Sequence, residues 1–128
     1  MAAEVWQGDR MSDFAVLKDE LILRLKRATP GMRVTREGPD GIELTSDWIH
    51  PSKPGQPMWF GGVRQGKAYV SYHLMPVYTH PALLETISPD LKKRMQGKSC
   101  FNFKVADAAL FDELEALTRE GAALYAKA

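Results

Sequence analysis

The stretch Met32–Leu74, MRVTREGPDGIELTSDWIHPSKPGQPMWFGGVRQGKAYVSYHL, decides the fold of this chain. Much of it alternates between polar side chains and apolar or small ones, which is the period-two pattern of strands that bury one face. Two turn segments, Gly38–Gly41 and Arg64–Lys67, interrupt this pattern. The stretch therefore predicts two consecutive antiparallel hairpins.

A proline-rich segment, Ile49–Pro57, separates the two hairpins. It contains three prolines and one glycine, and each proline removes a backbone amide donor, so we expect a loop. The first hairpin is expected to pair Met32–Glu37 with the strand that begins at Ile42. The second is expected to pair Met58–Val63 with Ala68–Leu74.

Alternation divides the side chains of the last strand between two faces. One face takes Ala68, Val70, Tyr72 and Leu74, and the other takes Tyr69, Ser71 and His73. In the preceding strand, the pair Gly61-Gly62 predicts a bulge, or a place where another group approaches the backbone closely.

Helical periodicity appears on both sides of the hairpins. The first helix is expected to begin with Ser12 as N-cap and to end at Thr29-Pro30-Gly31. Its apolar side chains recur at steps of three or four residues: Phe14, Leu17, Leu21, Leu25 and Ala28. The last helix is expected to follow Asp107 as its cap. Its stripe comprises Leu110, Leu114, Leu117, Gly121 and Leu124.

The segment between the second hairpin and the last helix holds further elements. Pro81 and Ser88-Pro89 each suit the start of a helix, so one broken helix or two short ones are expected, ending at Gly97. A short strand follows at Ser99–Lys104. The whole pattern predicts a two-layer α+β domain: a mostly antiparallel five-stranded sheet covered by about three helices.

Length and composition restrict the remaining classes. The 128 residues allow one domain, which we place at residues 12–128 after an N-terminal arm at residues 1–11, whose Val5 and Trp6 could dock on the domain. The single cysteine excludes an internal disulfide. No apolar run approaches the ~20 residues of a membrane span, so we expect a cytoplasmic protein and no membrane partner. The net charge of +1 gives no global field for nucleic acid.

Two segments carry a family resemblance: Val70–Tyr78, VSYHLMPVY, and Lys92–Lys104, KKRMQGKSCFNFK. With the order of elements from Ser12 to Gly121, they resemble the YdhG-like family of uncharacterised bacterial proteins. The resemblance implies a small α+β domain with a curved antiparallel sheet, an architecture likened to that of frataxin, an iron-handling protein. Relatives often carry a Ser-Tyr-Gly-x-Pro element, whereas Ile42–Pro57 here is longer and rich in Trp and Pro. The resemblance assigns no catalytic residue.

Aromatic side chains around the proline-rich loop suggest a ligand pocket. Large aromatic rings beside a loop that lacks amide donors provide contact area at a small entropic cost. We expect the pocket between the second hairpin and the helix after Pro81. Its lining residues would be Trp48, Trp59, Tyr72, His73 and Tyr78. The alternative is that both tryptophans only fill the end of the sheet.

Cys100 is the candidate nucleophile, with His73 as its base if the two share a sheet face. The positive charges of Lys98 and Lys104 would lower the thiol pKa. The simpler interpretation is a small buried thiol. A soft-metal site that adds His80 is disfavoured, because no compact ligand spacing is present.

Two charged groups suggest other partners. Frataxin-like iron binding would use carboxylates of the last helix, with Asp112 and Glu115 as weak candidates, although acidic side chains also suit a solvated helix face. Basic residues with neighbouring aromatic rings would suit nucleic acid, but Phe101 and Phe103 are expected to face the core. The basic residues are Lys92, Lys93, Arg94, Lys98 and Lys104.

The leading functional hypothesis is a binding or interaction domain without an evident catalytic site, with a small molecule or a protein as its partner. The first alternative is a frataxin-like iron-binding protein, with iron as the one cofactor considered. The second is a small enzyme that uses Cys100 as nucleophile. A homodimer also stays open, because a second copy could cover the apolar surface of the first helix.

Overall fold

The computed structural model describes residues 10–127. The expected docking of Val5 and Trp6 lies outside the described residues. The described part of the chain forms five strands: β1 Arg33–Gly38, β2 Gly41–Ile49, β3 Pro57–Gln65, β4 Val70–Leu74 and β5 Cys100–Phe103. The helices are α2 Arg10–Ala28, α3 Pro76–Thr79, the 3₁₀ helix η1 Pro81–Thr86, α4 Pro89–Lys92 and α5 Ala108–Lys127.

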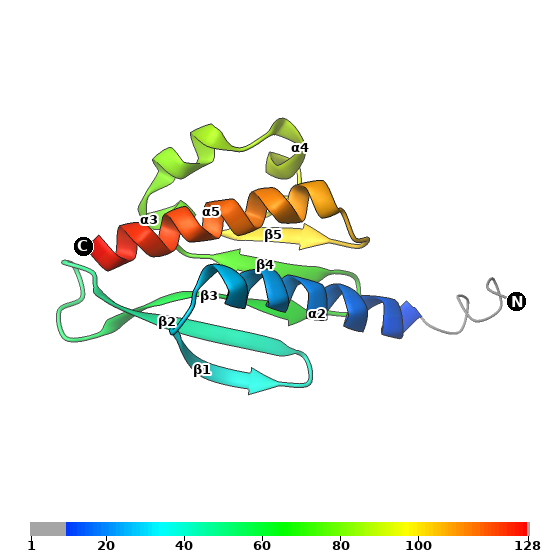
Figure 1. The fold of residues 1–128 in the computed structure, drawn as a ribbon, viewed down its shortest axis with the longest axis horizontal. Helices are drawn as coiled ribbons and strands as arrows, with labels where there is room; N and C mark the ends of the chain where they lie inside the picture. Colours follow the sequence, from blue (N-terminus) through cyan, green and yellow to red (C-terminus); the bar gives the residue numbers. More distant parts are fainter. Residues whose placement is uncertain (1–9, 128) are drawn as a thin grey trace, which may run out of the picture.

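The strands form one sheet in the order β1-β2-β3-β4-β5, and every neighbouring pair is antiparallel. The two long helices α2 and α5 pack against each other and run in the same direction over one face of this sheet (Figure 1). The short helices α3, η1 and α4 contact α5. The predicted α+β class and both hairpins are therefore confirmed. No helix within residues 10–127 is long and apolar enough to cross a membrane.

The core lies between the sheet and the two long helices. The predicted stripes face inward, since Leu21, Leu25 and Leu114 are fully buried. The predicted alternation of β4 and β5 is also confirmed, because Tyr72 and Phe101 are fully buried. Burying a large apolar side chain contributes about 1.5–3 kcal/mol, so this core stabilises the two-layer arrangement.

Several predicted boundaries are wrong by a few residues. Helix α2 begins at Arg10, so Ser12 is inside the helix, and the expected arm does not extend to residue 11. Arginine and methionine are good helix formers, which lets the helix start earlier. The second turn is shifted, because Gln65 pairs with Val70 and the amide of Gly66 donates to the carbonyl of Tyr69 at 2.9 Å.

The segment after β4 also differs from expectation. It forms three short helices and its last helix ends at Lys92, five residues before the predicted end. Prolines at positions 76, 81 and 89 each begin one of them, because proline suits a first turn but interrupts a continuing helix. Two predicted caps are confirmed, unlike Ser12: Ser88 Oγ accepts from the amide of Leu91 at 3.1 Å, and Asp107 Oδ1 accepts from that of Leu110 at 3.2 Å.

For Gly61-Gly62 the sequence predicts a bulge or a close approach to the backbone, and β3 has a bulge one residue earlier. Leu44 pairs with Gly61 and Thr45 pairs with Trp59, so Phe60 is the extra residue. The neighbouring glycines are required for close approach, since a Cβ at Gly62 would lie 2.3 Å from the carbonyl oxygen of Ile42. Position 62, in the middle strand of the sheet, therefore presents no side chain.

Candidate functional site

The face of the sheet opposite α2 and α5, here called the open face, carries a row of cross-strand partners. Successive pairings join Arg36 to Glu43, Glu43 to Gly62, Gly62 to His73, and His73 to Cys100. Paired residues of antiparallel strands project to the same face. Because the central member of the row is glycine, its neighbours surround an empty position.

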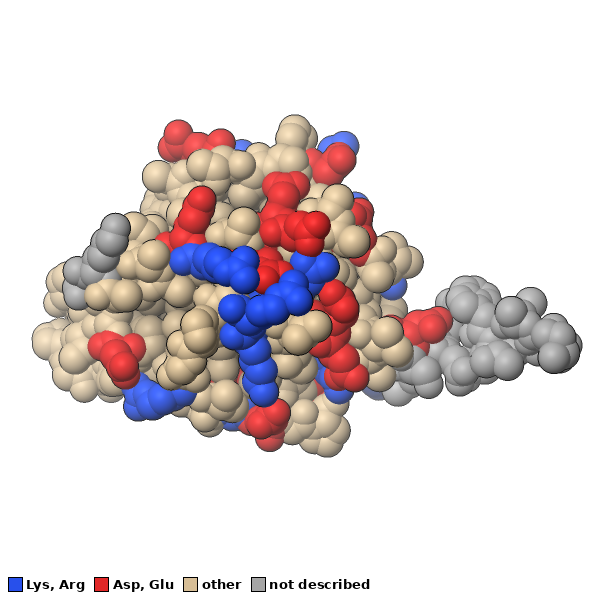
Figure 2. Space-filling view, viewed as in Figure 1, with Lys and Arg blue, Asp and Glu red and all other residues tan. Residues whose placement is uncertain are grey.

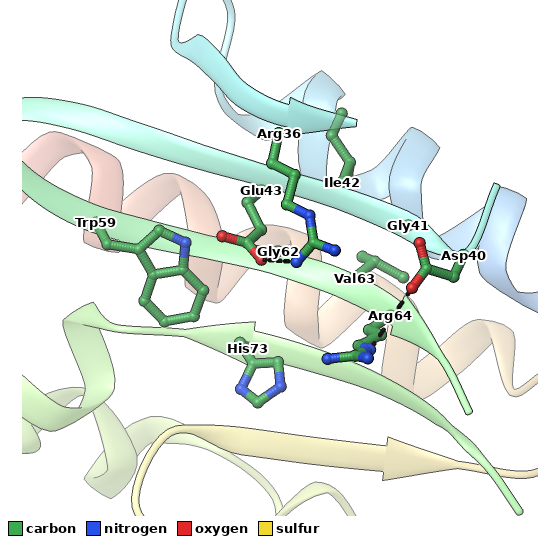
Figure 3. A pocket seen from close by; sticks show the side chains of 10 residues that line it. All are labelled: Arg36, Asp40, Gly41, Ile42, Glu43, Trp59, Gly62, Val63, Arg64 and His73. Carbon is green, nitrogen blue, oxygen red and sulfur yellow. Dashed lines mark hydrogen bonds and ion pairs between the residues drawn. The ribbon is translucent and has the colours of Figure 1, made fainter. Parts of the chain in front are cut away.

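A hollow of about 170 Å³ lies over this position, and we call it the Gly62 hollow. Figure 3 shows side chains from β1 to β4 around it, with both long helices behind the sheet. Its lining residues are Arg36, Asp40, Gly41, Ile42, Glu43, Trp59, Gly62, Val63, Arg64 and His73. The volume is well above what a single water needs.

Two arginines flank the Gly62 hollow, and each is only loosely paired. Arg36 Nη1 lies 3.4 Å from Glu43 Oε2, and Arg64 Nε lies 3.7 Å from Asp40 Oδ2. The two arginine side chains are 64% and 69% exposed. Exposed ion pairs of this kind contribute little to stability, so a ligand anion can compete for these guanidinium groups.

Trp59 forms one wall of the Gly62 hollow. Its ring centroid lies 5.8 Å from that of His73, with the two planes inclined by 54°. Its Nε1 is buried and has no hydrogen-bond partner within residues 10–127. A buried donor without an acceptor costs about 1–3 kcal/mol. This wall therefore combines apolar ring surface with an unused donor.

The candidate pair Cys100 and His73 does share the open face, with Sγ and Nε2 3.8 Å apart. Partial burial raises the pKa of the Cys100 thiol and lowers the pKa of the His73 imidazole. The thiol pKa is therefore raised, opposite to the direction predicted from Lys98 and Lys104: burial is the largest cause, a hydrogen bond with Ser71 opposes it, and neither lysine is among the causes. Both shifts favour the uncharged forms of the two groups, so the pair holds less thiolate than a free cysteine would.

The structure does not bring the five predicted pocket residues together. Only Trp59 and His73 line the Gly62 hollow. Tyr72 is fully buried, and its hydroxyl contacts Thr118 Oγ1 at 2.5 Å. Tyr78 is 52% exposed, with Lys98 Nζ 5.7 Å from its ring centroid. The alternation of β4 explains the separation, because it sends Tyr72 to the core.

Trp48 belongs to a different cluster at the end of the sheet. Its ring lies 4.4 Å from that of Tyr125, 5.2 Å from that of His50 and 5.5 Å from that of His80. It also packs against the core. For Trp48, the alternative interpretation as a filler of the sheet end fits the geometry.

A second hollow, of about 590 Å³, lies between the C-terminal ends of α2 and α5 and strand β2. Trp48 and Tyr125 are part of its wall, but much of the remainder is small residues such as Ala28, Gly31 and Ala122. Its arginine, Arg33, is 3.1 Å from Asp47. Binding sites usually combine apolar ring surface with a few polar groups that point toward one place. The Gly62 hollow, with its two arginines beside Trp59 and His73, has this combination, so we take it as the candidate site.

The candidate iron ligands Asp112 and Glu115 lie on α5 among arginines. Glu115 accepts from Arg27 at 2.7 and 2.8 Å and from Arg119 at 2.8 Å. Arg24 reaches both Glu115, at 3.1 Å, and Asp112. The hydrogen bonds from Arg27 are the largest cause that lowers the pKa of Glu115 to about 2. Figure 2 shows basic and acidic side chains gathered over α2 and α5.

Glu115 is therefore enclosed by three arginines, whereas Asp112 is 71% exposed and contacts Arg24. No group of three or more His, Cys, Asp or Glu residues in the described part of the chain is arranged to hold a metal ion. The five basic residues from Lys92 to Lys104 named above are all exposed, whereas Phe101 and Phe103 are buried, as predicted.

The sequence interpretation missed Arg36, Asp40, Glu43 and Arg64. A signal for the first hairpin was present, because counting outward from the Gly38–Gly41 turn brings Arg36 close to Glu43. The register runs unbroken from this turn to the Arg36–Glu43 pair, and the bulge between Val34 and Arg36 lies beyond it. Arg64 was assigned to a turn, so its place on β3 was not expected.

Comparison with known proteins found no matching family model, no matching curated protein and no matching solved structure.

Proposed function

We propose that this chain is a small-molecule binding domain whose ligand lies in the Gly62 hollow. One observation carries the proposal: an open position at the centre of the sheet is surrounded by two loosely paired arginines, an indole and a neutral imidazole. Ligand sites typically combine apolar ring surface with a few converging polar groups. The proposal narrows the expected partner from a small molecule or protein to a small molecule.

The family and the cellular location of this protein are also proposals. A YdhG-like identity is supported by the two quoted segments and agrees with the α+β fold that the resemblance implies. A cytoplasmic location is proposed on the sequence grounds given above. The iron-binding alternative gains no support from Glu115, which three arginines enclose, and Asp112 is an exposed carboxylate beside Arg24. The alternative in which Cys100 is a nucleophile keeps the contact between Cys100 and His73, but burial raises the pKa of the thiol and so disfavours the thiolate that this enzyme would need.

The test is chemical-shift mapping of the labelled chain against fragments that are neutral, cationic and anionic. Binding in the hollow is expected to shift the backbone amide of Gly62 and the indole N–H of Trp59 together. The indole of Trp48, in the other cluster, is the internal control and should stay unchanged. A library in which no fragment moves the Gly62 and Trp59 signals would contradict the proposal, as would binders that move Trp48 alone.

A further inference from the structure

We propose that the ligand of the Gly62 hollow is a small aromatic carboxylate, whose carboxylate binds Arg36 and whose ring lies over Trp59 and His73. This inference rests on the proposed function and adds the chemical class of the ligand. It combines three observations: an arginine that is easily released, an uncharged ring surface beside it, and a buried donor that lacks an acceptor.

The first observation concerns Arg36. A guanidinium presents N–H donors in a fixed fork that binds a carboxylate through two parallel hydrogen bonds. The described structure gives Arg36 a single contact, from Nη1 to Glu43 at 3.4 Å, which is long for a charge-assisted bond. A ligand carboxylate that accepts two hydrogen bonds from the guanidinium of Arg36 would replace Glu43, which makes one long contact. Arg64, across the hollow, is a second guanidinium, whose pairing with Asp40 at 3.7 Å is also loose.

The second observation concerns the ring surface. The centroids of Trp59 and His73 are 5.8 Å apart, which leaves no slot for a third ring between them, so a ligand ring would lie over both. Burial keeps His73 neutral at pH 7, so the negative charge of the ligand is directed to the arginines. Aromatic rings in tilted or offset contact attract each other beyond the effect of buried area.

The third observation concerns Glu43. Figure 3 shows its carboxylate between the guanidinium of Arg36 and the indole of Trp59. Glu43 and Trp59 project from neighbouring strands on the same face, and Trp59 Nε1 is buried without a partner within residues 10–127. A ligand that takes Arg36 frees Glu43 to accept from this indole. Ligand binding would thereby satisfy a donor that has no partner among the described residues.

The experiment uses benzoate as the probe, with Gly62 and Trp59 signals as readouts. Benzamide has the same ring and shape without the charge, benzylamine reverses the charge, and inorganic phosphate is an anion without a ring. Benzoate is expected to bind at least tenfold more tightly than each of the three. Its binding should move the indole N–H of Trp59 downfield, as expected for a new hydrogen bond to a carboxylate.

Two variants and a matched control test the role of Arg36. Arg36→Gln is expected to weaken benzoate binding at least tenfold. Arg33→Gln is the control, because Arg33 lies on the same strand, is similarly exposed and pairs with Asp47 outside the hollow. It should leave the affinity unchanged. Glu43→Gln removes the competing charge and is expected to tighten benzoate binding about threefold, an effect that lost structure would not produce.

The outcomes separate this inference from the proposed function. Benzamide or benzylamine bound at Gly62 as tightly as benzoate would overturn the anionic ligand class and leave a binding site in place. Phosphate bound as tightly would overturn the need for a ring. If Arg36→Gln fails to fold, Glu43→Gln decides, and unchanged or weaker benzoate binding overturns the inference. If benzoate does not bind but another fragment shifts the Gly62 and Trp59 signals, the result contradicts only the aromatic-carboxylate inference. If no fragment shifts these signals, the result contradicts this inference and the proposed binding function.

Discussion

The helical side and the open face of this molecule both place arginines beside carboxylates, but the two sets are held differently. Between α2 and α5, guanidinium nitrogens contact the carboxylate of Glu115 at 2.7–3.1 Å, and the Glu115 side chain is only 6% exposed. On the open face, the corresponding distances are 3.4 and 3.7 Å between exposed side chains. The first set joins two helices, whereas the second leaves its charges available.

The largest expected effect is on the helical side. Glu115→Gln would leave three arginines around a neutral amide, and removing one partner of a buried pair costs about 3–5 kcal/mol. Because two of the three arginines are about half exposed, we expect a loss near the low end, about 3 kcal/mol in the free energy of unfolding. Urea denaturation measures it. A loss below about 1 kcal/mol would mean that the two sets of ion pairs do not differ as described.

Lowering the pH should weaken the same contact between Glu115 and its arginines and so reduce the free energy of unfolding. The pKa of Glu115 is lowered to about 2 in the folded chain from its ordinary 4.5. Its contribution is therefore complete above pH 4.5 and is lost as the pH falls through about 2. Over this window we expect wild type to lose about 2–3 kcal/mol more than Glu115→Gln. Denaturation curves of both chains at pH 5, 3.5 and 2 test this, and parallel pH profiles would contradict it.

The sequence predicts the core of this fold better than the ends of its elements. The fold was predictable because local pattern and tertiary packing agree: the stripe from Leu17 to Ala28 and the alternation of Val70, Tyr72 and Leu74 all face one core. Boundaries were less predictable, since Arg10 and Arg64 suit more than one local structure.

The candidate site was harder to predict, because it depends on register. Trp59 and His73 were named, but the pocket predicted around them also included Tyr72, which alternation sends to the core. The arginines of the Gly62 hollow were missed, since Arg64 was assigned to a turn and the pairing of Arg36 with Glu43 was not counted out from the Gly38–Gly41 turn. The bulge at Phe60 instead lets Trp59 pair with Thr45. A one-residue shift in register reverses the face of a side chain, and composition does not report it.

Cys100 provides a prediction of intermediate size. Burial raises the pKa of its thiol, so the native chain holds less thiolate than the unfolded chain at the same pH. We expect iodoacetamide to alkylate the native chain at pH 7.4 at least threefold more slowly than the urea-denatured chain. The native rate should rise at a higher pH than the denatured rate. A native thiol that reacts faster than the denatured one would restore the enzyme hypothesis.

The smallest expected effect returns to the open face. Glu43→Gln breaks the pair with Arg36, and we expect the free energy of unfolding to change by less than about 0.5 kcal/mol, because both side chains are exposed and the contact is long. A double-mutant cycle with Arg36→Gln, measured by urea denaturation, should give a coupling energy in the same range. A coupling above about 1 kcal/mol would make this pair structural, like that of Glu115. The expected value instead leaves Arg36 nearly free of a role in folding, and a guanidinium that stability does not require can be given to a ligand.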